Sequence, residues 1–213
     1  MTRYTIIKDG YPFIFTGLAA TILVGFLADP AFAGIPLILT IYFAYFFREP
    51  DRPLPDDPHV LYSPADGTVM AVEEFFDDEF LHEEAKKVTI FLSVFNVHTN
   101  RAPMKGYVKY LRYTCGGFEP AFKGSAPLVN ERMAIGLENE QSRVLVVQIA
   151  GILARRIVSW TSLGKQLLQG ETYGMIKFGS STELIVPRDV EILVKKGDKV
   201  KGGITIMGRQ QVQ

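Results

Sequence analysis

The chain has 213 residues, and its 23 Lys and Arg side chains are balanced by 23 Asp and Glu, so the formal net charge is zero. This length fits one compact domain with a short appendage, and the charge balance lacks the basic excess typical of nucleic-acid-binding proteins. Cys115 is the only cysteine and there are three histidines, which excludes an internal disulfide and the usual zinc sites of Cys and His. We therefore expect no nucleic-acid partner and no metal ion.

Two uncharged apolar runs follow one another near the N-terminus, YPFIFTGLAATILVGFLA at 11–28 and AFAGIPLILTIYFAYFF at 31–47. A signal peptide has one apolar core and a cleavage site, so the second run argues against it. Each run is at the short end of the helices that span a bilayer. We expect residues 1–48 to form a hydrophobic helical hairpin that either crosses the membrane or dips into one leaflet. A buried hairpin of a soluble protein is the less favoured alternative, because its helices normally carry a polar face.

The charges that flank these runs predict an orientation. Arg3 and Lys8 precede the pair, Arg48 and Arg52 follow it, and only Asp29 lies between. Because basic residues concentrate on the cytoplasmic side of membrane segments, both flanks should be cytoplasmic. We expect a protein at the cytoplasmic face of the cell membrane, bound peripherally or inserted shallowly.

The character of the sequence changes after residue 48. Residues 49–59, EPDRPLPDDPH, hold four prolines and predict a stiff, extended linker. Residues 60–213 predict a β-rich domain, in which residues 154–168 are the clearest candidate for an amphipathic helix. The predicted strands are short, rich in β-branched residues and separated by Gly, Pro and Asp: 67–75, 88–94, 106–114, 142–150 and 190–196. The predicted fold class is mainly β (α+β), an antiparallel β-sandwich or barrel preceded by the helical hairpin.

The C-terminal segment VKKGDKVKGGITIMG resembles the Gly-Asp hairpin of biotinyl and lipoyl carrier domains, with ADGTVMAV (65–72) as its expected partner strand. This likeness supports one competing hypothesis, a membrane-tethered and non-enzymatic carrier or adaptor module. The segment lacks the Met-Lys-Met turn at which such carriers are modified, which argues against that hypothesis.

A Gly-Ser-Ser-Thr tetrad, residues 179–182, joins two apolar stretches that both read as strand. Such a tetrad is usually an inert turn. A serine hydrolase would need a Gly-x-Ser-x-Gly elbow between a strand and a helix, and Glu183 stands where the closing glycine is required. Another reaction suits this context better. The Ser180 hydroxyl can attack the carbonyl of Gly179, which has no Cβ to shield it, and convert the amide into an ester.

β-Elimination of that ester leaves a dehydroalanine, which hydrolyses to a pyruvoyl group at the new chain end. The ketone of this group is an electron sink made from the protein itself. The chemistry therefore predicts a covalent cofactor without any bound coenzyme.

Six motifs carry a resemblance to a known family: FFREPDR, SPADGTV, FLSVFNVHTNRAP, NERM, QIAGILARRIVSW and GETYGMIKFGSS. In this order and spacing, they identify the chain as similar to the phosphatidylserine decarboxylase proenzymes of the short, membrane-associated prokaryotic branch. The resemblance covers nearly the whole chain. It implies self-cleavage between Gly179 and Ser180 into a large chain, 1–179, and a small chain, 180–213, with Ser180 converted to the pyruvoyl cofactor.

The resemblance also implies the activity, decarboxylation of phosphatidylserine to phosphatidylethanolamine in phospholipid biosynthesis. The substrate amine would form a Schiff base with the pyruvoyl group, which accepts the electrons of the breaking bond as pyridoxal phosphate does elsewhere. The tetrad departs from the family pattern, since Ser181 stands where short relatives often have Arg. Only Ser180 directly follows the glycine, so we assign the cleavage to Ser180.

Two further site residues come from the resemblance. His98, in NVHTNRAP, is the leading acid/base candidate, because imidazole titrates nearest neutral pH; the alternative is a structural histidine. Asp66, in PADGTV, matches the family's acidic residue that orients a histidine and assists self-cleavage; the alternative is an Asp-Gly hairpin turn.

The longer branch of the family has a second histidine where this chain has Arg101, so a Ser-His-Asp relay cannot be transferred intact. Arg101 is instead a candidate contact for the substrate carboxylate or phosphate.

The remaining candidates are assigned less specifically. His59 and His82 lie among acidic and linker residues and are expected to be solvated. Arg132, Arg155 and Arg156 are either phosphate ligands or a solvated face. Ester-linked and archaeal ether-linked lipids carry the same head group, and the sequence leaves both open.

Overall fold

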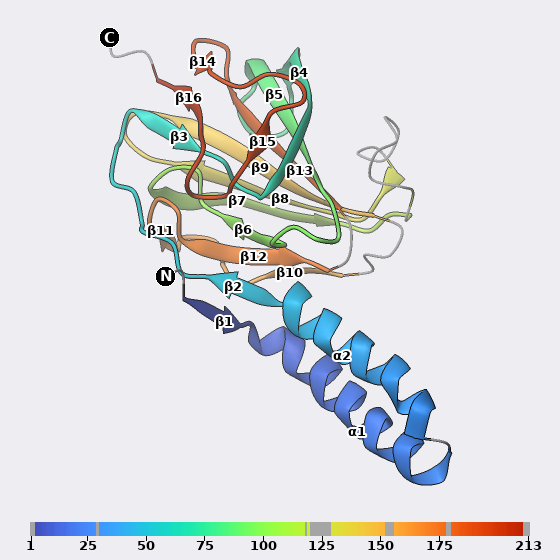
Figure 1. Cartoon of the computed structure of the whole chain (residues 1–213). Coiled ribbons are helices and arrows are strands. Elements are labelled where there is room, and N and C mark those ends of the chain that lie inside the picture. Colours follow the sequence, from blue (N-terminus) through green and yellow to red (C-terminus); the bar gives the residue numbers. More distant parts are fainter. Residues whose placement is uncertain are drawn as a thin grey trace. The chain divides into compact units, whose positions relative to one another are not determined.

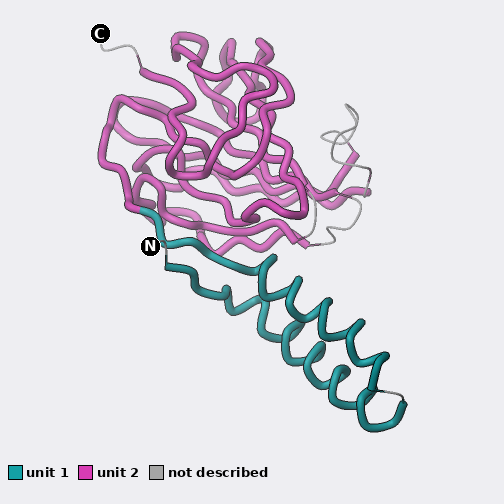
Figure 2. Tube along the Cα trace, viewed as in Figure 1, with its two compact units in different colours: residues 1–52 teal, residues 53–213 magenta. Residues whose placement is uncertain are grey.

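The computed structural model describes residues 3–28, 30–117, 119, 129–151, 156–177 and 180–210. The chain forms two compact units, residues 1–52 and 53–213, shown in teal and magenta in Figure 2. The border between them falls inside the proline-rich segment 49–59.

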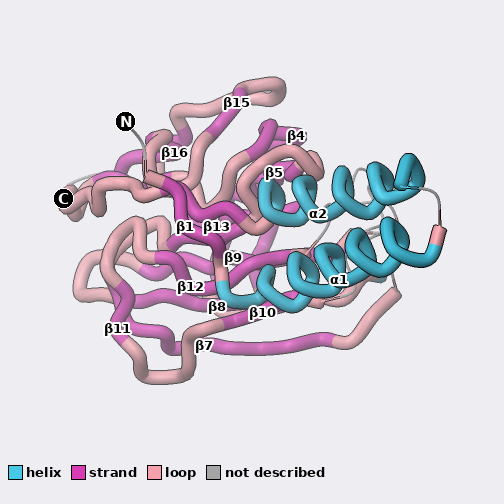
Figure 3. The backbone as a smooth tube through the Cα atoms, turned by 60° about the horizontal axis from the view of Figure 1, so that its bottom comes forward, coloured by secondary structure: helices cyan, strands magenta, loops and turns pink. Residues whose placement is uncertain are grey.

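The first unit is a helical hairpin closed by a small sheet. Its elements are β1 (Tyr4–Ile6), the 3-10 helix η1 (Lys8–Gly10), α1 (Tyr11–Leu27), the 3-10 helix η2 (Pro30–Ala33), α2 (Gly34–Phe46) and β2 (Arg48–Pro50). Strands β1 and β2 pair antiparallel, and α1 and α2 lie side by side (Figure 3). Gly17 permits this close packing, because a side chain there would collide with the Thr40 hydroxyl.

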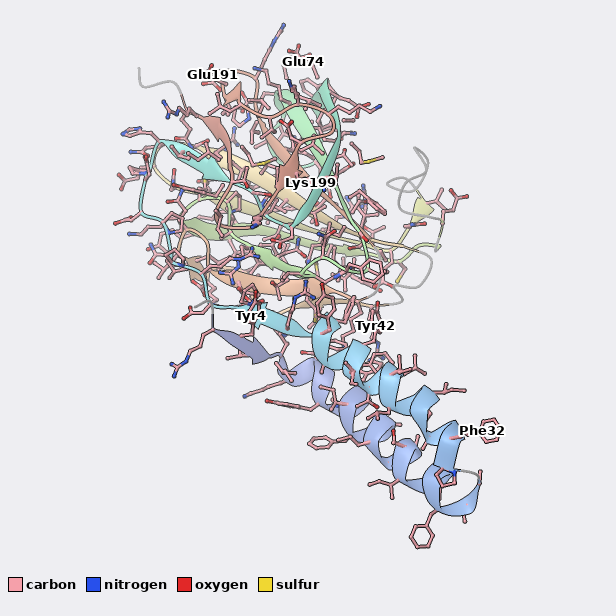
Figure 4. The ribbon with its side chains drawn as sticks, in the orientation of Figure 1. Tyr4, Phe32, Tyr42, Glu74, Glu191 and Lys199 are labelled. Atoms are coloured by element: carbon pink, nitrogen blue, oxygen red, sulfur yellow. The ribbon has the colours of Figure 1, made fainter. Side chains whose placement is uncertain are left out.

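The helices of the hairpin expose apolar side chains, and two of their threonine hydroxyls bond to their own backbone. Residues 8–27 form a helix long and apolar enough to cross a membrane, and the second apolar helix, Pro30–Phe46, is shorter. Phe26 is 89% exposed, and Phe32 projects from the far end of the hairpin (Figure 4). The Thr21 and Thr40 hydroxyls donate to backbone carbonyls one turn earlier, at 2.8 and 2.7 Å. This pattern is the one expected of helices in an apolar surrounding.

The second unit is built from three antiparallel sheets (Figure 1). Its strands are β3 (Val60–Tyr62), β4 (Gly67–Asp77), β5 (Glu83–Leu92), β6 (Thr99–Arg101), β7 (Gly106–Thr114), β8 (Arg132–Glu138), β9 (Arg143–Ala150), β10 (Ile157–Ser159), β11 (Gln166–Leu167), β12 (Thr172–Ile176), β13 (Ser180–Pro187), β14 (Glu191–Ile192), β15 (Lys199–Val200) and β16 (Ile206–Arg209). The large sheet has the order β11-β7-β8-β9-β13-β5-β4-β15, and the two smaller sheets are β10-β12-β6 and β14-β16-β3.

The large sheet packs one face against both smaller sheets. Its buried residues Ile90 and Val146 share one hydrophobic core with Leu61 of β3, Tyr173 of β12 and Met207 of β16. We call this side of the large sheet the inner face and the opposite side the outer face. The predicted fold class, an antiparallel β body preceded by a helical hairpin, is confirmed.

A smaller core lies on the outer face of the large sheet. It is built mainly from alternate residues of β5, β8, β9 and β13, with the loop after β4 packed against them: Leu81, Ala85, Ala134, Leu145, Val147, Ile149 and Ile185. The residues of a strand alternate between the two faces, so each strand in the middle of this sheet is buried on both sides. Near-continuous apolar runs such as 142–150 follow from that arrangement.

The predicted helix 154–168 is wrong. Residues 154 and 155 lie outside the described residues, and the rest of the segment contains β10 and β11. Ile157 and Val158 are β-branched and pair with β12, and Gly164 has a φ of 82°, which a helix cannot accommodate. The predicted pairing of the C-terminal hairpin is confirmed, because β15 pairs with Gly67 and Thr68.

Candidate active site

Strand β13 holds the predicted reactive serine inside the large sheet. Ser180 is its first residue and lies opposite Leu92 of β5 and Ala150 of β9. The side chain is 0% exposed. Among the described residues, its hydroxyl has no hydrogen-bond partner. Residues 178 and 179, which include the predicted cleavage partner Gly179, lie outside the described part of the chain. Residues 180–182 thus belong to a buried central strand.

The two adjacent serines lie on opposite faces of the large sheet. Leu184 and Val186 belong to the core on the inner face, whereas Ile185 belongs to the core on the outer face. Side chains alternate along a strand, so Ser180 and Thr182 lie on the inner face and Ser181 lies on the outer face. The two hydroxyls therefore have different neighbours although they are consecutive in sequence.

A network of neutral polar groups is buried on the inner face beside Ser180. The Asn100 amide nitrogen of β6 donates to the Thr182 hydroxyl at 2.9 Å and lies 3.4 Å from the Pro64 carbonyl oxygen. The Gln148 amide nitrogen of β9 donates to Asn100 Oδ1 at 2.8 Å. Asn100, Gln148 and Thr182 are all fully buried. Sequence reasoning missed these residues; the available signal was a glutamine within the apolar run 142–150.

The structure brings His98 into the neighbourhood of Ser180. The backbone N–H of Ile176 donates to the His98 carbonyl at 3.1 Å, and Ile176 packs against Ala150, which lies directly opposite Ser180. Two residues later on each strand, Asn100 contacts Thr182. These two contacts bring the residues at the start of β6 close to the start of β13, so His98 lies in the neighbourhood of Ser180.

The hydrogen bond of the His98 ring indicates its tautomer. Nδ1 lies 3.0 Å from the Asn96 carbonyl oxygen, which can only accept, so we infer that Nδ1 carries a proton. Nε2 is then the nitrogen whose protonation can change. His98 is fully buried, whereas His59 and His82 are exposed, as expected.

Asp66 and Arg101 are bound to other parts of the fold. Asp66 Oδ1 accepts a hydrogen bond from the Gly202 N–H at 2.8 Å, so it anchors the C-terminal hairpin. Arg101 is buried and donates to the Gly170 carbonyl at 3.0 Å. These contacts favour structural roles. The assistance of Asp66 in cleavage and the contact of Arg101 with substrate remain predictions.

Charged groups lie on the outer face of the large sheet, beside β13. Lys87 Nζ lies 3.9 Å from Glu183 and 3.3 Å from Glu73. Burial raises the pKa of the Glu183 carboxyl above its ordinary value, and the positive charges of Lys87 and Arg132 oppose this shift without cancelling it. Arg132 forms an ion pair with Glu79 at 3.8 Å, so the arginine of NERM has a partner within this group. Arg155 lies outside the described residues.

The described residues contain no group of three His, Cys, Asp or Glu side chains that could hold a metal ion. The candidate site contains a buried serine, a buried histidine and buried neutral amides. The fold around it is an antiparallel β-sandwich.

Comparison with known proteins identifies the family. The model of the phosphatidylserine decarboxylase family matches residues 39–208. A protein of Carboxydothermus hydrogenoformans named phosphatidylserine decarboxylase proenzyme is 50% identical over 173 residues, 81% of each chain. Proteins with the same name are 42% identical over 210 residues in Symbiobacterium thermophilum (98% of this chain, 97% of the relative) and 40% identical over 205 residues in Syntrophus aciditrophicus (95% and 96%).

This chain belongs to the phosphatidylserine decarboxylase family and is an enzyme of that family. The family resemblance read from the six sequence motifs is confirmed. The non-enzymatic carrier hypothesis is wrong, because the matched family is one of decarboxylases.

Proposed function

We propose that this protein decarboxylates phosphatidylserine to phosphatidylethanolamine, after cleaving itself between Gly179 and Ser180. The observation that carries the proposal is the environment of Ser180, whose buried hydroxyl lies at the start of a central strand and in the neighbourhood of His98. The word proenzyme in the names of the relatives agrees with a maturation step.

Self-cleavage proceeds in steps that conserve atoms. The Ser180 oxygen bonds to the Gly179 carbonyl carbon, the C–N bond breaks, and the hydroxyl proton ends on the Ser180 nitrogen. Loss of the Ser180 α-proton then expels the Gly179 carboxylate and leaves a dehydroalanine. Its tautomer takes up water and releases ammonia, so the small chain begins with a pyruvoyl group.

The residues around Ser180 fit this conversion. A pyruvoyl group has the same three carbons as serine and carries no hydroxyl donor. The Ser180 hydroxyl makes no hydrogen bond to the described residues, so the conversion breaks none. When present, the pyruvoyl ketone supplies an electron sink for the loss of carbon dioxide. We assign to His98 Nε2 the proton that replaces the carboxylate; the burial of His98 and the hydrogen bond of its Nδ1 support this assignment.

The strand order supports a stable pair of chains after cleavage. The small chain, 180–213, begins with β13, whose residues 180–187 pair with β5 and 180–185 with β9. Strand β16 pairs with β3 in another sheet. Both chains therefore contribute to the same core and stay together after the bond is cut.

We further propose that the hairpin holds the enzyme at the cytoplasmic face of the membrane, where its lipid substrate lies. Its exposed apolar helices and the basic residues on both flanks support this assignment. A chain that begins at Pro53 should leave the detergent phase in a partition experiment and still cleave itself. If that chain cannot fold, the hairpin has a structural role in the β body instead.

A denaturing gel with intact-mass measurement tests the central proposal. The purified protein should give two chains, 1–179 and 180–213, with a pyruvoyl group on the smaller one, and it should release carbon dioxide from phosphatidylserine vesicles. A single chain of 213 residues with no activity would contradict the proposal. Vesicles of ester-linked and ether-linked phosphatidylserine identify the preferred lipid.

A further inference from the structure

We infer that Gln148 is a positioning residue for self-cleavage, whose side-chain oxygen accepts the hydrogen bond of the Ser180 hydroxyl and directs it toward Gly179. This inference rests on the proposed self-cleavage and adds a residue that the family resemblance did not supply.

The contacts of Asn100 determine which atom of the Gln148 amide is left over. The Pro64 carbonyl oxygen can only accept, so the Asn100 atom that faces it is the amide nitrogen. Asn100 Oδ1 therefore faces Gln148, which must present its own amide nitrogen. Gln148 Oε1 is then the remaining atom of the amide, and it can only accept.

Gln148 Oε1 has no hydrogen-bond partner among the described residues, although Gln148 is fully buried. A buried polar atom without a partner costs about 1–3 kcal/mol, so such atoms are rare unless function requires them. The amide also lies close to the backbone of β12: a Cβ built on Gly174 would lie 2.5 Å from the Val158 carbonyl oxygen and 3.3 Å from Gln148 Nε2. The position of the acceptor is thus held by Asn100 on one side and by the backbone of β12 on another.

The matching donor lies on the same face of the sheet. Ser180 is opposite Ala150 on β9, and Gln148 is two residues before Ala150, which makes Gln148 the diagonal neighbour of Ser180. Diagonal neighbours are within reach of a long side chain. Ser180 Oγ is the donor without a partner, and Gln148 Oε1 is the acceptor without a partner. We infer that rotation of the Ser180 side chain toward Gln148 pairs the two atoms, while Gln148 keeps its hydrogen bond to Asn100.

The hydrogen bond orients the hydroxyl without removing its proton. An amide oxygen is too weak a base to take the proton, which ends on the Ser180 nitrogen when the peptide bond breaks. The hydrogen bond raises the cleavage rate through geometry, because an attacking oxygen held in the correct direction reacts faster than one that rotates freely. A misplacement of about 1 Å lowers a reaction rate on the order of a hundredfold.

The first experiment compares two glutamine-to-methionine variants of the full chain. Gln148→Met removes the acceptor and keeps the side-chain volume. Gln169→Met is the matched control: Gln169 is also buried and makes hydrogen bonds to Asp57 N, Asp57 O and Val60 O at 2.9, 3.0 and 2.7 Å. Each chain is synthesised briefly with labelled leucine, which occurs in both products, and the conversion to two chains is followed on denaturing gels.

Gln148→Met should cleave on the order of a hundredfold more slowly than the wild type. Gln169→Met should cleave at the wild-type rate, even though it loses more hydrogen bonds. Wild-type cleavage in Gln148→Met overturns the inference, and so does equal slowing in both variants, since that indicates a general loss of stability. A wild-type chain that stays intact defeats the proposed self-cleavage itself, which is a distinguishable result.

Gln148→Glu tests the same contact through its pH dependence. The neutral acid donates to Asn100 Oδ1 and keeps a carbonyl acceptor for Ser180, whereas the carboxylate places an oxygen against an oxygen. Cleavage of this variant should therefore be near the wild-type rate at low pH and fall as the pH rises through the pKa of the new carboxyl, relative to the wild-type profile. If the ratio of the two rates is constant from pH 5 to 8, the inference is wrong, whether or not Gln148→Met folds.

Discussion

The two faces of β13 differ in the kind of polar group that they bury. On the inner face, Ser180 and Thr182 lie with the neutral amides of Asn100 and Gln148. On the outer face, Ser181 shares its side with Glu183, whose carboxylate lies near Lys87. Both serines are buried, and neither hydroxyl has a partner among the described residues.

Because both serines are buried, burial alone does not distinguish the serine that we propose to be reactive. Neutral amides have a definite donor and acceptor at each end, so they direct a hydroxyl without adding a charge. The carboxylate on the outer face is disfavoured by its own burial and needs Lys87 nearby. Of the two serines, Ser180 is the one that directly follows Gly179.

The largest expected effect separates the two serines. Ser180→Ala should leave a single chain without activity, because both the attacking hydroxyl and the precursor of the ketone are lost. Ser181→Ala should still give two chains, since its hydroxyl lies on the other face. Intact mass and a denaturing gel decide between them. If Ser181→Ala alone remained uncut, the assignment of the bond would be wrong.

Removal of the His98 imidazole should have the next largest effect. His98→Ala should reduce phosphatidylserine turnover about a hundred- to ten-thousandfold, the usual cost of losing a positioned acid or base. Self-cleavage can depend on the same imidazole, so the rate is divided by the fraction of small chain that carries pyruvoyl, counted by mass spectrometry. Near-normal turnover per pyruvoyl group would return His98 to a structural role.

A smaller effect is expected when the inner network loses one hydroxyl. Thr182→Val keeps the shape of the side chain and removes the acceptor of the Asn100 amide. It should lower the stability by about 1 kcal/mol, or the Tm by about 3 °C. The measurement is made in the uncut Ser180→Ala chain. Thr89 of β5 lies opposite Glu183 on the outer face, so Thr89→Val is the control. An equal loss in both variants would show that the network adds nothing specific.

The smallest effect concerns the outer face and depends on pH. The pKa of Glu183 is raised in the folded chain, so its contribution to stability is present below the unfolded value of about 4.5 and is lost as the pH rises through the folded pKa. Glu183→Gln has no such charge, and Lys87 keeps Glu73 as a partner. The variant should gain stability relative to the parent between pH 5 and 8, measured by urea unfolding in the Ser180→Ala chain. If the difference in the free energy of unfolding between the variant and the parent stays constant with pH, this prediction is contradicted.

Several features of the fold could be predicted because they depend on neighbours in sequence. The uncharged runs predicted the hairpin, and alternating β-branched segments predicted β4, β5, β7 and β9. The helix predicted for 154–168 was wrong, because the apolar spacing of this segment also suits short strands. Residues 157–159 form a strand because they pair with β12. The predicted strand 190–196 is confined to Glu191 and Ile192.

By itself, the sequence determined the reactive bond proposed here, since a serine hydroxyl and the preceding glycine carbonyl are covalent neighbours in any fold. It also determined the family, because the order and spacing of the motifs can be read from the sequence alone. Only the tertiary structure decided what surrounds that bond. Asn100 is 82 residues from Thr182 and 48 from Gln148, and no local pattern predicts that three strands will bring them together. The pairing of β13 between β5 and β9 turned Ser180 inward and Ser181 outward, because alternate side chains of a paired strand must face opposite sides.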